Sequence, residues 1–84
     1  MDVKRAVEVA KAHVMNVLGA ELSDVPTTEE VWFDSKKAEW CVTLGILRGI
    51  SPIAGLRLPE YKTVRLNKTD GSLVSIRSRE LSRV

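Results

Sequence analysis

The sequence predicts an α+β domain in which one N-terminal amphipathic helix packs on a four-stranded, mainly antiparallel sheet, in the order α-β-β-loop-β-β. Three observations predict this class. Residues 2–20 repeat apolar side chains every three or four positions, as a helix with one buried face does. Residues 30–47 contain two alternating segments, and two more flank a glycine turn at position 71. A chain of 84 residues has room for one core, so residues 1–84 are expected to form a single domain.

The helix is expected to run from Asp2 to about Ala20. Asp2 can cap its first turn, and Gly19 is expected to end it in the left-handed conformation. The apolar stripe consists of Val3, Ala6, Val7, Ala10, Val14, Val17 and Leu18.

The first hairpin is expected to join segments 30–34 and 39–47, with Phe33 opposite Trp40. In this register the apolar residues of both strands fall on one face. Trp32 then points to the other face, beside Cys41.

The second hairpin turns at Asp70-Gly71, which usually indicates a two-residue turn. A three-residue loop, 69–71, instead pairs Val64 with Ile76 and Leu66 with Val74, so that all four lie on one apolar face. We therefore predict the longer loop. The opposite face then carries Tyr61, Thr63, Arg65, Ser75, Arg77 and Arg79.

These patterns predict one core between helix and sheet. Its expected members are Val7, Val14, Phe33, Trp40, Val42, Leu44, Val64, Leu66, Val74 and Ile76. Segment 48–59 has no clean period but holds the aliphatic residues Ile50, Ile53, Leu56 and Leu58. Two interpretations of it stay open: the segment caps the open end of the core, or it exposes an apolar binding surface together with Trp32.

The residues that carry catalysis in proteins are sparse here. His13 is the only histidine and Cys41 the only cysteine, so neither a nucleophile-base pair nor a metal site is indicated. Glu29, Glu30, Asp34 and Glu39 could form an acid-base pair, but solvated strand ends explain them more simply. No phosphate-binding glycine motif is present. We expect a protein that is not an enzyme, with no catalytic residue, no metal and no cofactor.

Localisation and charge restrict the partner class. The first residues mix charge with apolar side chains, unlike a signal peptide or membrane helix, and one cysteine cannot form an internal disulfide. A cytoplasmic protein without membrane attachment is expected. Residues 1–47 hold five Lys/Arg against eight Asp/Glu, and residues 48–84 hold eight against three, so the molecule is expected to be electrically polarised.

Residues 40–83 contain the layout Trp40-x-Val42, a proline-containing gap, Tyr61-x-x-Val64-x-Leu66, Asp70-Gly71-x-Leu73 and Arg77. This layout resembles the C-terminal half of the gas-vesicle protein O family, whose arginine-rich end Arg79 and Arg83 match. The helix and the tyrosine-to-glycine ending also look like small PepSY domains. The chain departs from both in its longer Tyr61-to-Val64 step and in Asn67, where an aspartate is common. The resemblance implies a non-enzymatic accessory or assembly role.

We therefore expect a protein-interaction domain, a small adaptor, accessory or regulatory subunit, that binds a protein with an acidic surface. A homodimer is a further option. The alternative is a weak nucleic-acid-binding protein that uses the arginine-bearing sheet face to grip phosphates and stack a base. The candidate partner-binding residues are Arg65, Arg77, Arg79, Tyr61, Trp32, Ile53 and Leu56.

Overall fold

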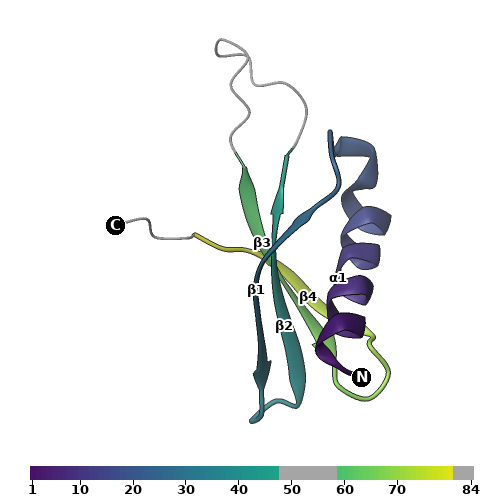
Figure 1. Ribbon diagram of the computed structural model, residues 1–84, viewed down its shortest axis with the longest axis vertical. Helices are drawn as coiled ribbons and strands as arrows, with labels where there is room; N and C mark the ends of the chain where they lie inside the picture. The colour runs from purple at the N-terminus through teal and green to yellow at the C-terminus, as the bar shows by residue number, and fades with distance from the viewer. Residues whose placement is uncertain (48–58, 81–84) are drawn as a thin grey trace.

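The computed structural model describes residues 1–47 and 59–80 and confirms the predicted α+β class (Figure 1). Each strand pairs antiparallel with its neighbours in sequence, so the sheet order is β1-β2-β3-β4. The elements are α1 (Val3–Leu18), the 3₁₀ turn η1 (Gly19–Glu21), β1 (Thr27–Asp34), β2 (Glu39–Ile46), β3 (Glu60–Asn67) and β4 (Leu73–Ser78).

Helix α1 begins as the sequence predicts and ends differently. The side chain of Asp2 accepts a hydrogen bond of 2.8 Å from the backbone N–H of Arg5, which satisfies one of the free amides of the first turn. Gly19 was expected in the left-handed region, and this prediction is wrong, because its φ and ψ are −52° and −39°. The right-handed path continues instead into η1, whose tighter turn closes through a bond from Leu22 N–H to the Gly19 carbonyl.

The first hairpin has the predicted register, with Phe33 opposite Trp40 and Trp32 opposite Cys41. Strand β1 starts three residues earlier than predicted, at Thr27, because a bulge at Glu29 lets it continue along β2.

The second hairpin combines a longer loop with a bulge. Asn67 donates its backbone N–H to the Ser72 carbonyl, so the loop holds residues 68–71, one more than predicted. Gly71 is left-handed as predicted, with φ 71°. Leu66 pairs with Leu73 rather than with Val74, which is the extra residue of a bulge in β4.

Beyond that bulge the predicted register holds, since Val64 pairs with Ile76 and Arg65 with Ser75. Val74 is 49% exposed, so its predicted place in the core is wrong. The extra residue of a bulge does not follow the alternation of the strand, so the pattern of apolar residues could not show that Val74 points away from the core.

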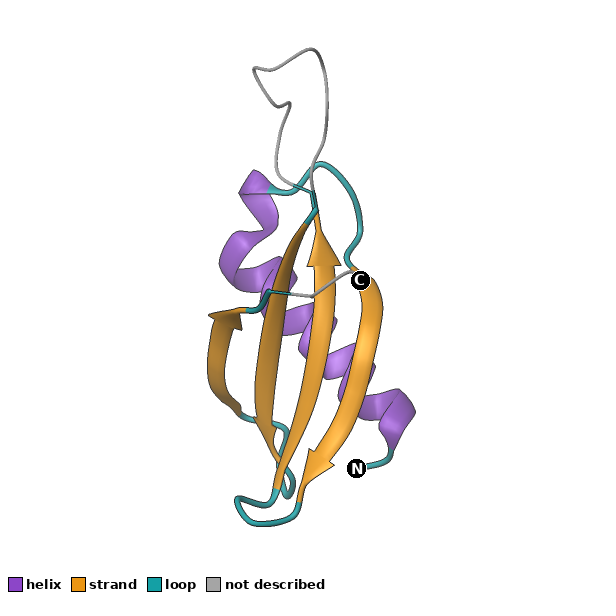
Figure 2. Ribbon diagram, turned by 90° about the vertical axis from the view of Figure 1, so that its left-hand side faces the viewer, coloured by secondary structure: helices purple, strands orange, loops and turns teal. Residues whose placement is uncertain are grey.

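The core lies between α1 and one face of the sheet. Figure 2 shows the sheet from the opposite side, with α1 crossing behind it. Phe33 is 38% exposed and packs edge-on against Trp40 at the rim of this core rather than inside it. The buried core residues are Ala6, Ala10, Val14, Val42, Leu44, Ile46, Val64 and Leu66.

Helix α1 is also attached to the end of the sheet where the hairpins turn. Nε2 of His13 lies 3.1 Å from the carbonyl oxygen of Gly71 and donates to it. The single histidine therefore has a structural contact that holds α1 against the β3–β4 turn.

Candidate functional site

Five of the predicted partner-binding residues share the sheet face that α1 leaves uncovered, called here the helix-free face. Successive side chains of a strand point to opposite faces. Because Val42, Leu44, Val64 and Leu66 face the helix, their neighbours point away from it. The five are Trp32, Tyr61, Arg65, Arg77 and Arg79. The other two, Ile53 and Leu56, lie outside the residues that the structure describes.

The strand register arranges this face in rows that run across the sheet. Each row takes one residue from each strand, with Arg79, which directly follows β4, completing the first, and neighbours within a row lie opposite one another. From β1 to β4 the rows are Thr27–Gly45–Tyr61–Arg79, Glu30–Thr43–Thr63–Arg77 and Trp32–Cys41–Arg65–Ser75.

The two small side chains in the centre of the helix-free face are fully buried. Cys41 and Thr43 of β2 both have 0% exposure although α1 lies on the other side of the sheet. The Thr43 hydroxyl lies 2.9 Å from that of Thr63, so its polar group is satisfied. Burial raises the pKa of the Cys41 thiol, which keeps it protonated and a poor nucleophile.

Arg65 ties β3 to the first hairpin. Its Nη1 donates to Asp34 Oδ2 at 3.2 Å and to Glu39 Oε1 at 3.1 Å. The hydrogen bond from Arg65 is the main reason that the pKa of the Asp34 carboxyl is lowered, and the backbone N–H groups of Lys37 and Lys36 add to the effect. The positive charge of Arg65 is therefore compensated within the molecule.

Arg79 reaches from β4 to the far edge of the sheet. Its Nε lies 2.9 Å from Glu30 Oε1, and its guanidinium carbon lies 5.4 Å from the centre of the Trp32 ring. Because Glu30 and Trp32 both belong to β1, these two contacts join the end of β4 to the opposite edge strand of the sheet.

Arg77 differs from the other two arginines. Among residues 1–47 and 59–80 it makes no ion pair. It is exposed and lines a shallow groove of about 200 Å³. The groove is lined by Trp32, Thr63, Arg65, Ser75, Arg77, Ser78 and Arg79.

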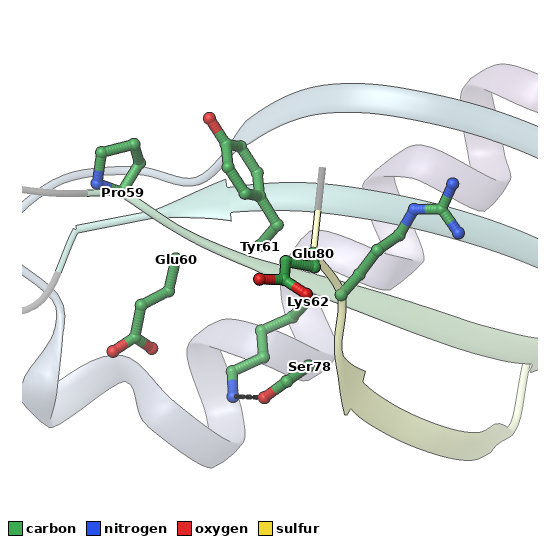
Figure 3. Close-up of a pocket in the computed structure, with 7 residues that line it drawn as sticks. Pro59, Glu60, Tyr61, Lys62, Ser78 and Glu80 are labelled. Atoms are coloured by element: carbon green, nitrogen blue, oxygen red, sulfur yellow. Dashed lines mark hydrogen bonds between the residues drawn. The ribbon is translucent and has the colours of Figure 1, made fainter. Parts of the chain in front are cut away.

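A second hollow, of about 520 Å³, lies where β3 begins and β4 ends (Figure 3). Lys62 points away from Tyr61 and donates a hydrogen bond of 2.8 Å to the Ser78 hydroxyl. Arg79 lines this hollow as well as the Arg77 groove. The hollow is lined by Pro59, Glu60, Tyr61, Lys62, Ser78, Arg79 and Glu80.

The acidic residues of this face were not predicted as part of the site. Glu30, Asp34 and Glu39 were interpreted as solvated strand ends, yet each pairs with an arginine, Arg65 of β3 or Arg79 directly after β4. The predicted register of the first hairpin could have indicated them, because side-chain alternation places all three on the same face as Trp32. Side-chain alternation does not show that an arginine such as Arg65 can reach a carboxylate two strands away.

Other kinds of site are limited as follows. In the part of the chain that the structure describes, no three His, Cys, Asp or Glu side chains form a group that could hold a metal ion. None of the helices described here is long and apolar enough to cross a membrane.

No family model, curated protein or solved structure matched the chain. The resemblance to gas-vesicle protein O and PepSY domains therefore stays a prediction.

Proposed function

We propose that this chain is a non-enzymatic protein-interaction domain, a small adaptor or accessory subunit. Its binding surface is the helix-free face, and its partner is a protein that places an acidic side chain opposite Arg77. One observation carries the proposal: Arg77 stands exposed, and without an ion pair among the described residues, in a groove walled by Trp32. An aromatic wall beside a free arginine is the composition that protein interfaces favour.

The two edges of the sheet are poorer binding sites than its face. An edge strand binds an added strand through its free backbone groups. Both edge strands here carry a bulge, at Glu29 in β1 and at Val74 in β4. Bulges twist an edge away from regular pairing and protect it from strand addition. This favours recognition by side chains of the face.

Nucleic-acid binding is the alternative function. It needs several positive charges free to neutralise phosphates. Arg65 and Arg79 already pair with Asp34, Glu39 and Glu30. A phosphate backbone would have to displace these carboxylates, whereas an acidic side chain of a protein needs only Arg77.

A photo-crosslinking amino acid at Ser75 tests the proposal in the native cell. Ser75 lies on the helix-free face of β4, opposite Arg65, so a bound partner would stand within reach of its side chain. The matched control carries the same amino acid at Ala12, an exposed position on α1. We expect protein adducts from position 75 and none from position 12.

The nature of the adduct distinguishes the functions. Adducts that are removed by protease and resist nuclease support a protein partner. Nuclease-sensitive adducts from position 75 would favour the nucleic-acid alternative. Equal protein adducts from both positions would contradict the helix-free face as the binding surface.

A further inference from the structure

A third hollow, called here the Gly45 hollow, lies at the end of the sheet where β1 and β3 begin and β2 ends. Its volume is about 350 Å³, which is enough for one long side chain. The described residues that line it include no Lys or Arg, so its charge is opposite to that of the groove around Arg77. They are Asp24, Val25, Thr27, Glu29, Gly45, Leu47, Pro59 and Tyr61.

Gly45 forms the floor of this hollow. It pairs with Tyr61 and follows the buried core residue Leu44, so a Cβ atom added to it would point away from α1, onto the helix-free face. That Cβ would stand 2.8 Å from Thr27 Oγ1 and 3.3 Å from Glu29 Oε2. It would also stand 3.5 Å from Tyr61 Cε1. Three side chains therefore gather around a point that only glycine leaves open.

Two carboxylates give the hollow a negative charge. Glu29 Oε2 accepts a hydrogen bond of 2.8 Å from the Thr27 hydroxyl. Asp24 Oδ1 accepts one of 2.7 Å from the backbone N–H of Val25. Neither carboxylate forms an ion pair with a residue that the structure describes. Their hydrogen-bond donors are neutral, so both charges stay uncompensated.

The rest of the lining is apolar or aromatic. Val25 is 66% exposed, Pro59 is exposed and Leu47 is half-buried. Apolar surface beside carboxylates matches lysine and arginine, whose methylene stems are apolar and whose tips are charged. The ring of Tyr61, which points to the opposite side of β3 from Lys62 (Figure 3), can add a cation–π contact with such a tip.

Other occupants fit this lining less well. A hard metal ion takes six or more oxygen ligands, whereas no three potential ligands come together among residues 1–47 and 59–80. An acidic side chain would be repelled by Glu29 and Asp24. A purely apolar side chain would remove water from these carboxylates without pairing with them, which costs free energy.

We propose that the Gly45 hollow binds a lysine or arginine side chain of the protein partner. This assignment rests on the proposed function, since it names a second contact of the same partner. Arg77 lies one row away and two strands from Gly45. With about 3.4 Å per residue and about 4.8 Å between strands, the two positions are about 12 Å apart. The partner therefore presents a basic side chain at roughly this distance from the acidic one that faces Arg77.

Nuclear magnetic resonance with a minimal probe tests the chemistry of the hollow. Nα-acetyl-arginine N-methylamide is added to the labelled full chain, up to about 50 mM at constant ionic strength. We expect saturable amide shifts at Gly45 and Tyr61. The citrulline counterpart, which has the same shape without the charge, should bind at least about threefold more weakly.

Protein variants identify the carboxylate that carries the charge. Glu29→Gln should weaken binding of the arginine probe at least about threefold. Glu8→Gln, at an exposed position of α1, makes the same change of charge and should leave binding unchanged. Asp24→Asn should weaken binding as well, and it keeps the test decisive if Glu29→Gln alters the fold. No shift at Gly45, equal binding of the citrulline probe, or carboxylate variants that bind like the wild type would overturn the inference.

A photo-crosslinking amino acid at Val25 tests whether the side chain comes from the partner. In the native cell we expect the same protein adduct from Val25 as from Ser75. An adduct from Ser75 alone would overturn the inference and leave the proposed function standing. Probe binding without a protein adduct from either position would indicate a small cation as ligand and would remove both.

Discussion

Arg79 and Glu30 form an ion pair across the whole width of the sheet, with 2.9 Å between Nε and Oε1. The first residue follows β4 and the second lies in β1, so the ion pair connects the two edges of the sheet. The pair holds the guanidinium over the Trp32 ring. The chemical character of this face therefore depends on one long side chain.

Removal of that side chain should expose Trp32. In a Trp40→Phe background, where Trp32 is the only tryptophan, Arg79→Ala should increase acrylamide quenching of the remaining fluorescence, because the guanidinium no longer covers the ring. Arg77→Ala, which removes an arginine from the same strand face, is the matched control and should change quenching less. Equal quenching in the two variants would mean that Arg79 does not cover the ring.

Acid should remove the contribution of Asp34 to stability. The pKa of Asp34 is lowered in the folded protein, first by the hydrogen bond from Arg65, relative to an ordinary value of 3.8. The unfolded chain thus binds the proton more readily, so the stabilisation is present above pH 3.8 and is lost as the pH falls through the folded-state pKa.

The variant Asp34→Asn tests whether Asp34 causes this loss of stability in acid. Its amide oxygen can still accept from the backbone N–H of Lys36, but it does not titrate. The free energy of unfolding, measured by urea titration between about pH 6 and about pH 2.5, should fall less steeply with acid in the variant than in the wild type. Parallel curves would show that the Arg65 contact does not stabilise the charged carboxyl.

How far the sequence predicts the structure depends on the kind of contact. Alternation and helical period predicted the class, the first register and the shared face of Trp32, Arg65 and Arg77, because these follow from backbone geometry. The bulges at Glu29 and Val74 were missed, since an extra residue leaves no trace in an apolar pattern. The ion pairs were missed because the alternation of side chains shows which residues share a face but not which partner a long arginine side chain will contact.

The bulge in β4 gives a direct contrast between two apolar residues. Leu66 is fully buried, so Leu66→Ala should lower the free energy of unfolding by about 2–5 kcal/mol. Val74 is half exposed, so Val74→Ala should cost less than about 1 kcal/mol, although the alternating pattern assigned both to the core. Urea denaturation of both variants measures the difference. Similar losses would place Val74 in the core after all.

Ala38 carries backbone strain that glycine would relieve. Its φ of 54° lies in the left-handed region, which costs an L-residue about 1–2 kcal/mol relative to glycine. Glycine also makes the unfolded chain more flexible, which lowers the free energy of unfolding by about 0.4–1 kcal/mol. Because the strain relieved is larger, Ala38→Gly should raise the free energy of unfolding by roughly 0.5 kcal/mol. Ala12→Gly, at an exposed position of α1, is the matched control and should lower stability by about 1 kcal/mol. A loss in both variants would exclude strain at Ala38.

The central claim is that the helix-free face recognises a protein. Amide chemical shifts of the isotope-labelled full chain, recorded with and without lysate of its native cell, test it most directly, because they report the contact surface residue by residue. We expect shifts or line broadening for Trp32, Thr63, Ser75 and Arg77 when lysate is present, with the exposed α1 residues Lys4, Glu8 and Ala12 unchanged. Changes concentrated on α1, or spectra that lysate does not alter, would contradict the claim.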